Sequence, residues 1–172
     1  MDRVLLTVAT LAFAIGVYLL MLKGWRGRQR RQGDLPPPPA PPASPGEVVV
    51  GAVPGLFVGT THEGAWLDRV NVHGLSDRSA GWVEVTTAGV HVEREGVADL
   101  HLPYDVLLSA QTGDALAGKF VGRDGMLVLT WQLGPARVVS GFRADDHAAH
   151  ARLAEAISAR IPARTPSPEE TP

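Results

Sequence analysis

The spacing of apolar and polar residues changes several times along this chain of 172 residues. Residues 4–22 form an apolar run of nineteen residues that holds no charge. After residue 47, short stretches alternate between apolar and polar positions and are separated by Gly and Pro, which is typical of half-buried β-strands. After residue 145, apolar residues recur every three or four positions, as on one face of a helix. The pattern therefore predicts an apolar N-terminal helix, a strand-rich domain and a terminal amphipathic helix.

The apolar run of residues 4–22 has the length of a membrane-spanning helix. At about 1.5 Å per residue it would extend roughly 28 Å, which is close to the hydrocarbon thickness of a bilayer. A cleaved signal peptide is the alternative, because Ala14, Ile15 and Gly16 resemble a cleavage site. That site lies inside the apolar run, which continues for six more residues, so an uncleaved transmembrane helix is the prediction.

A cluster of basic residues follows the apolar run at residues 23–31 and predicts how the helix is oriented. The residues expected at the membrane interface are Lys23, Trp25, Arg26, Arg28, Arg30 and Arg31. Only Arg3 precedes the run, and short basic segments remain cytoplasmic. We therefore expect a single-pass protein of the cell membrane, with residues 1–3 outside and the C-terminal domain in the cytoplasm. The cluster is expected to contact the lipid bilayer and not nucleic acid, because so short a run lacks a folded context.

Composition divides the rest of the chain into a linker, a domain and a tail. Residues 32–46 hold seven of the fourteen prolines, which predicts an extended polyproline II spacer. Residues 47–161 form the domain, and residues 162–172 are expected to be disordered. The domain carries 14 acidic and 9 basic residues. This excess of acidic residues argues against binding to DNA or to an anionic membrane surface.

About seven antiparallel strands are predicted in the domain. The first falls in two parts, 47–50 and 56–61, with an interruption at Pro54. The others cover residues 82–86, 90–93, 100–102, 105–112, 126–133 and 137–142, and 119–121 is a further short candidate. The clearest hairpin joins 82–86 to 90–93, because Gly89 can adopt the positive φ that a tight turn needs.

The terminal helix is predicted over residues 145–161. Its apolar stripe consists of Ala149, Leu153, Ala156, Ile157 and Ile161. Asp145 and Asp146 suit the helix N-terminus, and Pro162 ends the helix. Such a helix would cover the open end of a small, strongly bent antiparallel β-barrel or orthogonal sandwich, so the predicted fold class is mainly β.

Candidate catalytic and metal-binding residues are few. The chain has no cysteine, which excludes disulfides, thiolate nucleophiles and Cys-type zinc sites. His147 and His150 have the i, i+3 spacing of some metal ligands, but without a distant third ligand we expect a solvated first turn and no metal or cofactor. Ser76 lacks the G-x-S-x-G motif of a hydrolase nucleophile, because Arg78 stands where the second Gly belongs. No phosphate-binding glycine motif is present, so catalysis is not expected.

The densest run of polar side chains is the candidate partner-binding segment. It consists of Thr60, Thr61, His62, Trp66, Asp68, Arg69 and His73. The two other histidines of the domain, His91 and His101, lie on predicted strands and are expected at the surface. The tryptophans of the strands are expected mainly in the core.

The chain resembles the membrane-anchored bacterial PH-like proteins of high-GC Gram-positive bacteria. The resemblance rests on residues 55–75, 118–134 and 140–146 and on the order of anchor, basic flank, Pro-rich spacer and strand-rich domain. It implies a PH-like fold and no reaction. The loop after the first strand lacks the Lys/Arg cluster of phosphoinositide-binding PH domains, since Arg69 and Arg78 stand among acidic residues.

These observations favour a non-enzymatic, membrane-tethered interaction module that presents a cytoplasmic PH-like domain to a protein or peptide partner. One alternative is an accessory subunit of a membrane transport or export complex, in which Ala12 and Gly16 would let the apolar helix pack against other helices. The other alternative is a small hydrolase or a metal-binding enzyme that uses the histidines.

Overall fold

The computed structural model describes residues 10, 11, 13–21, 35–113, 115, 116, 119, 120 and 125–163. The chain forms two compact units, Met1–Asp34 and Leu35–Pro172, which are described separately. In the first unit, residues 10, 11 and 13–21 are helical. No helix within the ranges given above is long and apolar enough to cross a membrane. Much of the predicted span of residues 4–22, and all of the basic flank 23–31, lies outside the described residues.

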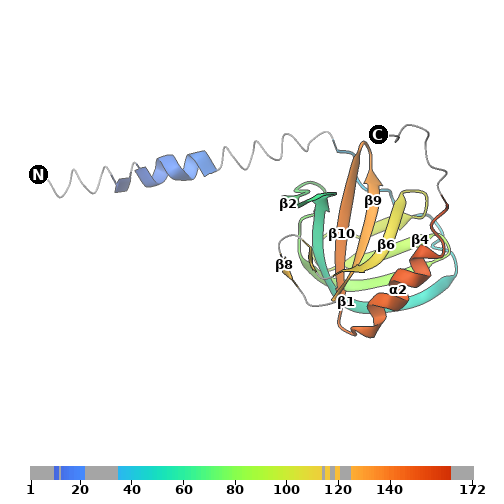
Figure 1. The fold of residues 1–172 in the computed structure, drawn as a ribbon. Coiled ribbons are helices and arrows are strands. Elements are labelled where there is room, and N and C mark those ends of the chain that lie inside the picture. The colour runs from blue at the N-terminus through green and yellow to red at the C-terminus, as the bar shows by residue number, and fades with distance from the viewer. Residues whose placement is uncertain are drawn as a thin grey trace, which may run out of the picture. The chain divides into compact units, whose positions relative to one another are not determined.

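The second unit is an antiparallel β-sheet with one terminal helix (Figure 1). The sheet has eight strands: β1 (Val48–His62), β2 (Ala65–Arg69), β3 (Ser79–Thr86), β4 (Gly89–Arg94), β5 (Leu100–Pro103), β6 (Leu107–Gly113), β9 (Met126–Leu133) and β10 (Ala136–Ala144). The strands follow the order β5-β4-β3-β1-β10-β9-β6, and β2 pairs with β1. A separate two-stranded ribbon consists of β7 (Ala115–Leu116) and β8 (Lys119–Phe120), and the helix is α2 (Ala148–Ser158).

The prediction of a mainly β domain with a terminal helix is confirmed in outline and corrected in detail. The sheet is open, with β5 and β6 at its two ends, and it has one strand more than the seven predicted. The additional strand is β2, a five-residue segment that is too short to show a clear alternation of apolar and polar residues. The predicted hairpin between residues 82–86 and 90–93 is present as β3 and β4.

Strand β1 is continuous through Pro54, where the sequence predicted an interruption. Its pairing with β3 is irregular between Val48 and Val53, and such bulges bend a strand without ending it. On its other side β1 pairs with β10 only from Gly55 onward, so the missing N–H of Pro54 is not needed there. Gly55 is required at this bend, because a Cβ atom there would overlap the carbonyl oxygen of Arg143 on β10.

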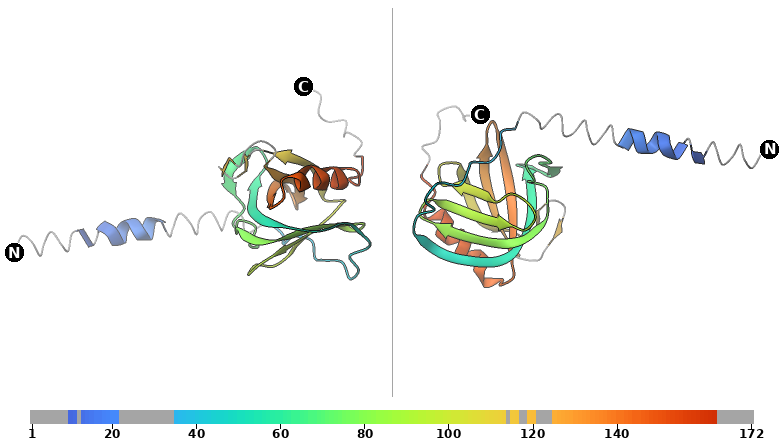
Figure 2. Two further views of the ribbon diagram at one scale, coloured as in Figure 1. Left: turned by 90° about the horizontal axis from the view of Figure 1, so that it is seen from below. Right: turned by 180° about the vertical axis from the view of Figure 1, so that it is seen from behind.

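The core lies between the curved sheet and α2, as Figures 1 and 2 show. Its largest fully buried side chains include Phe57, Trp131, Phe142, Leu153 and Ile157. Helix α2 contacts β6, β9, β1, β10 and β3. The predicted apolar stripe is therefore confirmed at Ala149, Leu153 and Ile157, which are buried, while Ala156 and Ile161 are half-buried.

The described part of the Pro-rich linker, residues 35–46, lies along the domain. Leu35 packs against the core, and its carbonyl oxygen is 2.9 Å from Nε2 of His73. Pro36 lies so close to Gly134 that a Cβ atom on Gly134 would be 2.7 Å from the proline ring. At the other end, the N–H of Glu47 donates to Oγ1 of Thr87 (3.0 Å). The apolar side chain of Leu35 thus attaches the segment to the fold, so these residues are not a free spacer.

Candidate functional site

Strand β6 is an end strand of the open sheet, and it lies beside α2 (Figure 1). On its other side β6 pairs with β9, with Ser109 opposite Thr130 and Gln111 opposite Val128. The carbonyl oxygen of Ala110 instead accepts a hydrogen bond from Oγ of Ser158 on α2 (2.7 Å). The N–H and C=O of one strand residue point to the same side, so the N–H of Ala110 also faces the α2 side.

Two hollows are lined by residues of β6 and of α2 or the segment after it, and both residues of the Ser158–Ala110 hydrogen bond line the second. The first has a volume of about 510 Å³ and is lined by Thr112, His147, Ala148, His150 and Ala151. The second has a volume of about 350 Å³ and is lined by Leu108, Ser109, Ala110, Ser158, Ile161, Pro162 and Ala163. We call this edge and its two hollows the β6–α2 groove. None of these lining residues is acidic, Lys or Arg.

His150 lines the first hollow and is buried. The prediction that it lies in a solvated first turn is therefore wrong. Its Nε2 accepts a hydrogen bond from the N–H of Ala144 (2.8 Å), at the end of β10. Its Nδ1 is 3.5 Å from Nδ1 of His147. His150 therefore ties the first turn of α2 to the end of β10. Asp146 fixes the same turn, because its Oδ1 accepts from the N–H of Ala148 (3.0 Å).

This hydrogen bonding argues against a metal ion at His147 and His150. A neutral imidazole has one nitrogen lone pair, and in His150 the N–H of Ala144 already occupies it. A metal at Nδ1 would require the proton to move to Nε2, where it would face that N–H group. Within the described residues, no group of three or more His, Cys, Asp or Glu side chains has a metal-binding arrangement.

Burial lowers the pKa of His150, and the neighbouring His147 lowers it further, against the opposing effect of Asp146. Burial also lowers the pKa of His101, which is buried and not at the surface as expected. In the pH range below the ordinary histidine pKa of about 6.5 and above these lowered values, the unfolded chain binds more protons than the folded chain. The free energy of unfolding therefore falls as the pH is lowered through this range.

We expect the melting temperature to fall between about pH 7.5 and pH 5.5, and His150→Gln to make this fall shallower. Glutamine does not titrate, and its amide oxygen can accept the N–H of Ala144. Circular-dichroism melting of both chains across this range is the measurement. Equal slopes for the two chains would mean that His150 does not contribute to the pH dependence.

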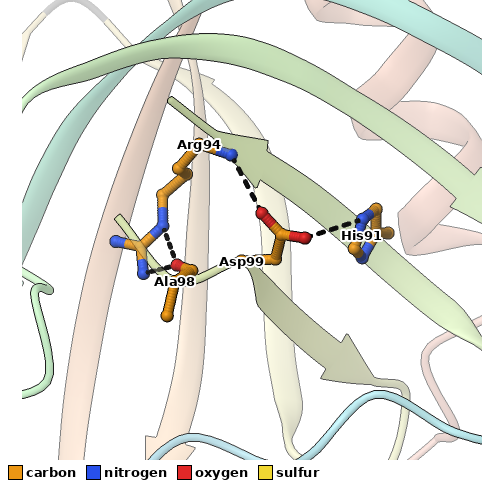
Figure 3. A network of polar contacts seen from close by, with 4 residues as sticks. All are labelled: His91, Arg94, Ala98 and Asp99. Atoms are coloured by element: carbon orange, nitrogen blue, oxygen red, sulfur yellow. Dashed lines mark hydrogen bonds and ion pairs between the residues drawn. The ribbon is translucent and has the colours of Figure 1, made fainter. Parts of the chain in front are cut away.

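A second polar cluster centres on Arg94, which is buried (Figure 3). Its Nε donates to the carbonyl oxygen of Ala98 (2.8 Å), as does Nη2, and its Nη1 donates to that of Gly74 (2.8 Å). The guanidinium also lies 5.0 Å from the ring centroid of Phe57. Burial lowers the pKa of Arg94, while Asp77 and Asp99 oppose that shift. Because its donors are directed at the main chain of two loops, Arg94 fixes those loops to the core.

Asp99 connects this cluster to the outer side of β4. Its Oδ1 accepts from the N–H of Arg94 (3.3 Å), and its Oδ2 lies 3.9 Å from Nε2 of His91 (Figure 3). His91 in turn packs against Trp82, with ring centroids 5.3 Å apart. These interactions stabilise the turn between β4 and β5.

The predicted partner-binding segment is only partly accessible. Thr60 and Thr61 are buried, and Oγ1 of Thr60 is 2.8 Å from Oγ of Ser140, so these two residues are part of the core and not of a binding surface. Asp68 and His73 are exposed, and His62 is half-buried. Arg69 donates from Nη1 to the carbonyl oxygen of Ser76 (3.0 Å).

The described residues do not bring these side chains into a catalytic arrangement. The ring of His73 contacts the carbonyl oxygen of Leu35, and Oγ of Ser76 is directed at Asp77 (3.4 Å). The hydroxyl of Ser76 therefore donates to a carboxylate and not to a histidine. The side chain of Trp66 lies outside the described part of the structure, as do Lys23, Trp25, Arg26, Arg28, Arg30 and Arg31.

A comparison with known protein families places the second compact unit in a family. The family model described as bacterial PH domain-like matches residues 35–158, which cover the described linker, the whole sheet and α2. No curated protein matches the chain. The family match confirms the PH-like part of the sequence resemblance, and its start at residue 35 coincides with the start of the second compact unit.

Proposed function

We propose a function that starts from one fact: the chain belongs to the bacterial PH domain-like family. The protein is a non-catalytic interaction module. Its domain binds an extended segment of a partner protein in the β6–α2 groove. The observation that carries the proposal is the pair of hollows between the outer edge of β6 and α2, two elements that are joined by the Ser158–Ala110 hydrogen bond. An extended peptide can add to such an edge as a further strand, and pockets beside the edge can hold its side chains.

The opposite end of the sheet is less suited to strand addition. Strand β5 has four residues, and Leu100, His101 and Leu102 are all buried. Pro103 ends the strand and has no N–H to donate. Of the two end strands, β6 therefore has the more exposed side chains.

An anionic lipid headgroup is supported less well as the ligand of this domain. Such a ligand needs several cations that converge on one site. Arg69 donates to a main-chain carbonyl, Arg137 lies 3.9 Å from Glu63, and Arg78 is exposed next to Asp77. Lys119 and Arg123, two further basic residues of the domain, have no described side chains.

Photocrosslinking in the native membrane tests the proposal. Benzoylphenylalanine would replace Ala151, which lines the first hollow, or Ala163, which lines the second. An extended segment advances about 3.3 Å per residue, so both positions should crosslink to the same partner within about ten residues of its sequence. Ala159 is exposed next to the end of α2 and lines neither hollow, so it is the control and should give no such adduct. Adducts to distant regions of the partner, or an equal adduct from position 159, would contradict the proposal.

Membrane tethering by residues 4–22, with the domain in the cytoplasm, is the second part of the proposal. It is supported by the length of the apolar run and by the excess of basic residues after it. We expect alkaline phosphatase fused after Pro172 to be inactive and a green fluorescent protein fused there to fluoresce in the membrane fraction. An active phosphatase fusion would show that the orientation is reversed or that the run is a signal peptide.

A further inference from the structure

The first turn of α2 is attached to the sheet mainly by one buried histidine. His150 is 2% exposed, and its Nε2 accepts a hydrogen bond from the N–H of Ala144 at the end of β10 (2.8 Å). Of the apolar residues in this turn, Ala149 is buried, while Ala148 and Ala151 are exposed. A single alanine methyl group buries little apolar surface. The contact of His150 with Ala144 is therefore the specific attachment of this turn.

The rest of α2 is attached by larger contacts. Leu153 and Ile157 are fully buried in the core. Oγ of Ser158 donates to the carbonyl oxygen of Ala110 on β6 (2.7 Å). These contacts do not involve the first turn, so that turn can separate from β10 while the remainder of the helix stays packed.

The geometry specifies the protonation state of the His150 ring. Because Nε2 accepts a hydrogen bond, it carries no proton, and the proton of the neutral ring is on Nδ1. This Nδ1 lies 3.5 Å from Nδ1 of His147. A second proton, added at Nε2, would face the N–H of Ala144, and two donors cannot form a hydrogen bond. The attached turn therefore excludes the protonated ring.

The charged and titratable groups that act on His150 are His147, Asp146 and Arg143. Strands β6 and β9 contain no titratable residue, and β1 places Gly55 opposite Ala144. Burial lowers the pKa of His150, His147 and Arg143 lower it further, and Asp146 and the main chain of His147 oppose that shift. Separation of the turn would return the ring to water, where the pKa of histidine is about 6.5. The separated turn thus binds a proton more tightly than the attached turn, so acid favours separation.

We propose that His150 is a pH-sensitive latch, whose protonation releases the first turn of α2 from β10 while the sheet and the rest of the helix remain folded. Four of the five residues that line the first hollow, His147, Ala148, His150 and Ala151, belong to this turn or directly precede it. Release would therefore change the first hollow and leave the second, whose helix-side lining begins at Ser158. This inference goes beyond the proposed function and does not depend on what the groove binds.

Hydrogen exchange of the full-length chain in detergent micelles, measured by mass spectrometry at pH 7.5 and pH 5.5, tests the latch. After correction for the intrinsic pH dependence of exchange, residues 144–151 should exchange faster at pH 5.5 by about threefold or more. The labelling time is chosen so that β9 does not exchange at pH 7.5, and β9 should remain unexchanged at pH 5.5. Exchange of β9 together with residues 144–151 would mean that the whole domain unfolds, and would overturn the latch.

Two variants assign the effect to His150. In His150→Gln the amide oxygen can accept the N–H of Ala144 and does not titrate, so residues 144–151 should exchange equally at both pH values. His147→Gln is the matched control, because His147 is exposed. It removes a group that lowers the pKa of His150, so the acid-dependent increase should persist and begin at a higher pH. The same increase in His150→Gln as in the wild type would overturn the inference.

A measurement on the wild-type chain needs no substitution. Nitrogen-15 NMR of the histidine rings at pH 7.5 should show His150 with its proton on Nδ1 and none on Nε2. A proton on Nε2 at this pH would contradict the hydrogen bond from Ala144 and with it the latch.

Discussion

Leu153→Asp should abolish the cooperative unfolding transition of the domain. Leu153 is fully buried on the face of α2 that packs against the sheet, in the same cluster as Trp131 and Phe142. Truncation of such a side chain to Ala costs about 2–5 kcal/mol. An unpaired carboxylate at the same place adds the cost of burying a charge, and a domain has only about 5–15 kcal/mol of stability. The measurement is thermal unfolding followed by the fluorescence of the tryptophans, one of which, Trp131, is buried.

Arg152→Asp is the matched control, because Arg152 is the exposed neighbour of Leu153 on the same helix. It should melt within a few degrees of the wild-type chain, since surface substitutions usually change stability by about 0.5 kcal/mol or less. A Leu153→Asp chain that melts like the wild type would mean that α2 is not packed on the core in solution.

Arg94→Met should lower the free energy of unfolding by about 3 kcal/mol, because a hydrogen bond from a charged group contributes about 1.5–3 kcal/mol. The carbonyl oxygens of Ala98 and Gly74 would lose their donors, and the contact of the guanidinium with Phe57 would be lost. Methionine keeps much of the apolar volume, so the experiment isolates the hydrogen bonds. Urea unfolding of the full-length chain measures the difference.

Arg94→Lys should recover only part of this loss, since one ammonium group cannot reproduce the planar guanidinium that reaches both carbonyls. Arg78→Met is the control, because Arg78 is exposed. If Arg94→Met and Arg78→Met had equal stability, Arg94 would not fix the two loops to the core.

The sequence predicted the elements that have a regular apolar period. Strand β9 was predicted with its observed bounds, Met126–Leu133, and Leu153 and Ile157 were placed on the buried face of α2. The same helical period places His150 on the face of α2 that carries Leu153 and Ile157. The sequence pattern could therefore have predicted that His150 is buried. Its polarity suggested solvent, but the N–H of Ala144 satisfies its ring nitrogen in the interior.

The parts that could not be predicted depend on which strands become neighbours. Thr60 and Thr61 belong to a polar run in the sequence, but their strand lies inside the sheet, where Ser140 on β10 provides a partner for Thr60. The packing of Leu35 depends on His73 and the core, which are distant in sequence. The β6–α2 groove likewise exists only because β6 is the end strand and Ser158 is brought to Ala110, 48 residues earlier in the chain.

The most direct test of the groove as a binding site is the affinity of one extended peptide for three full-length chains. The peptide is the partner segment mapped by crosslinking, and the chains are wild type, Ala151→Arg and Ala159→Arg. Both variants place an arginine at an exposed position, Ala151 on α2 and Ala159 directly after α2. Only Ala151 lines a hollow. Binding in the groove predicts that Ala151→Arg weakens the affinity by about tenfold or more, while Ala159→Arg stays within about twofold of wild type. Equal affinities for all three chains would contradict binding in the β6–α2 groove.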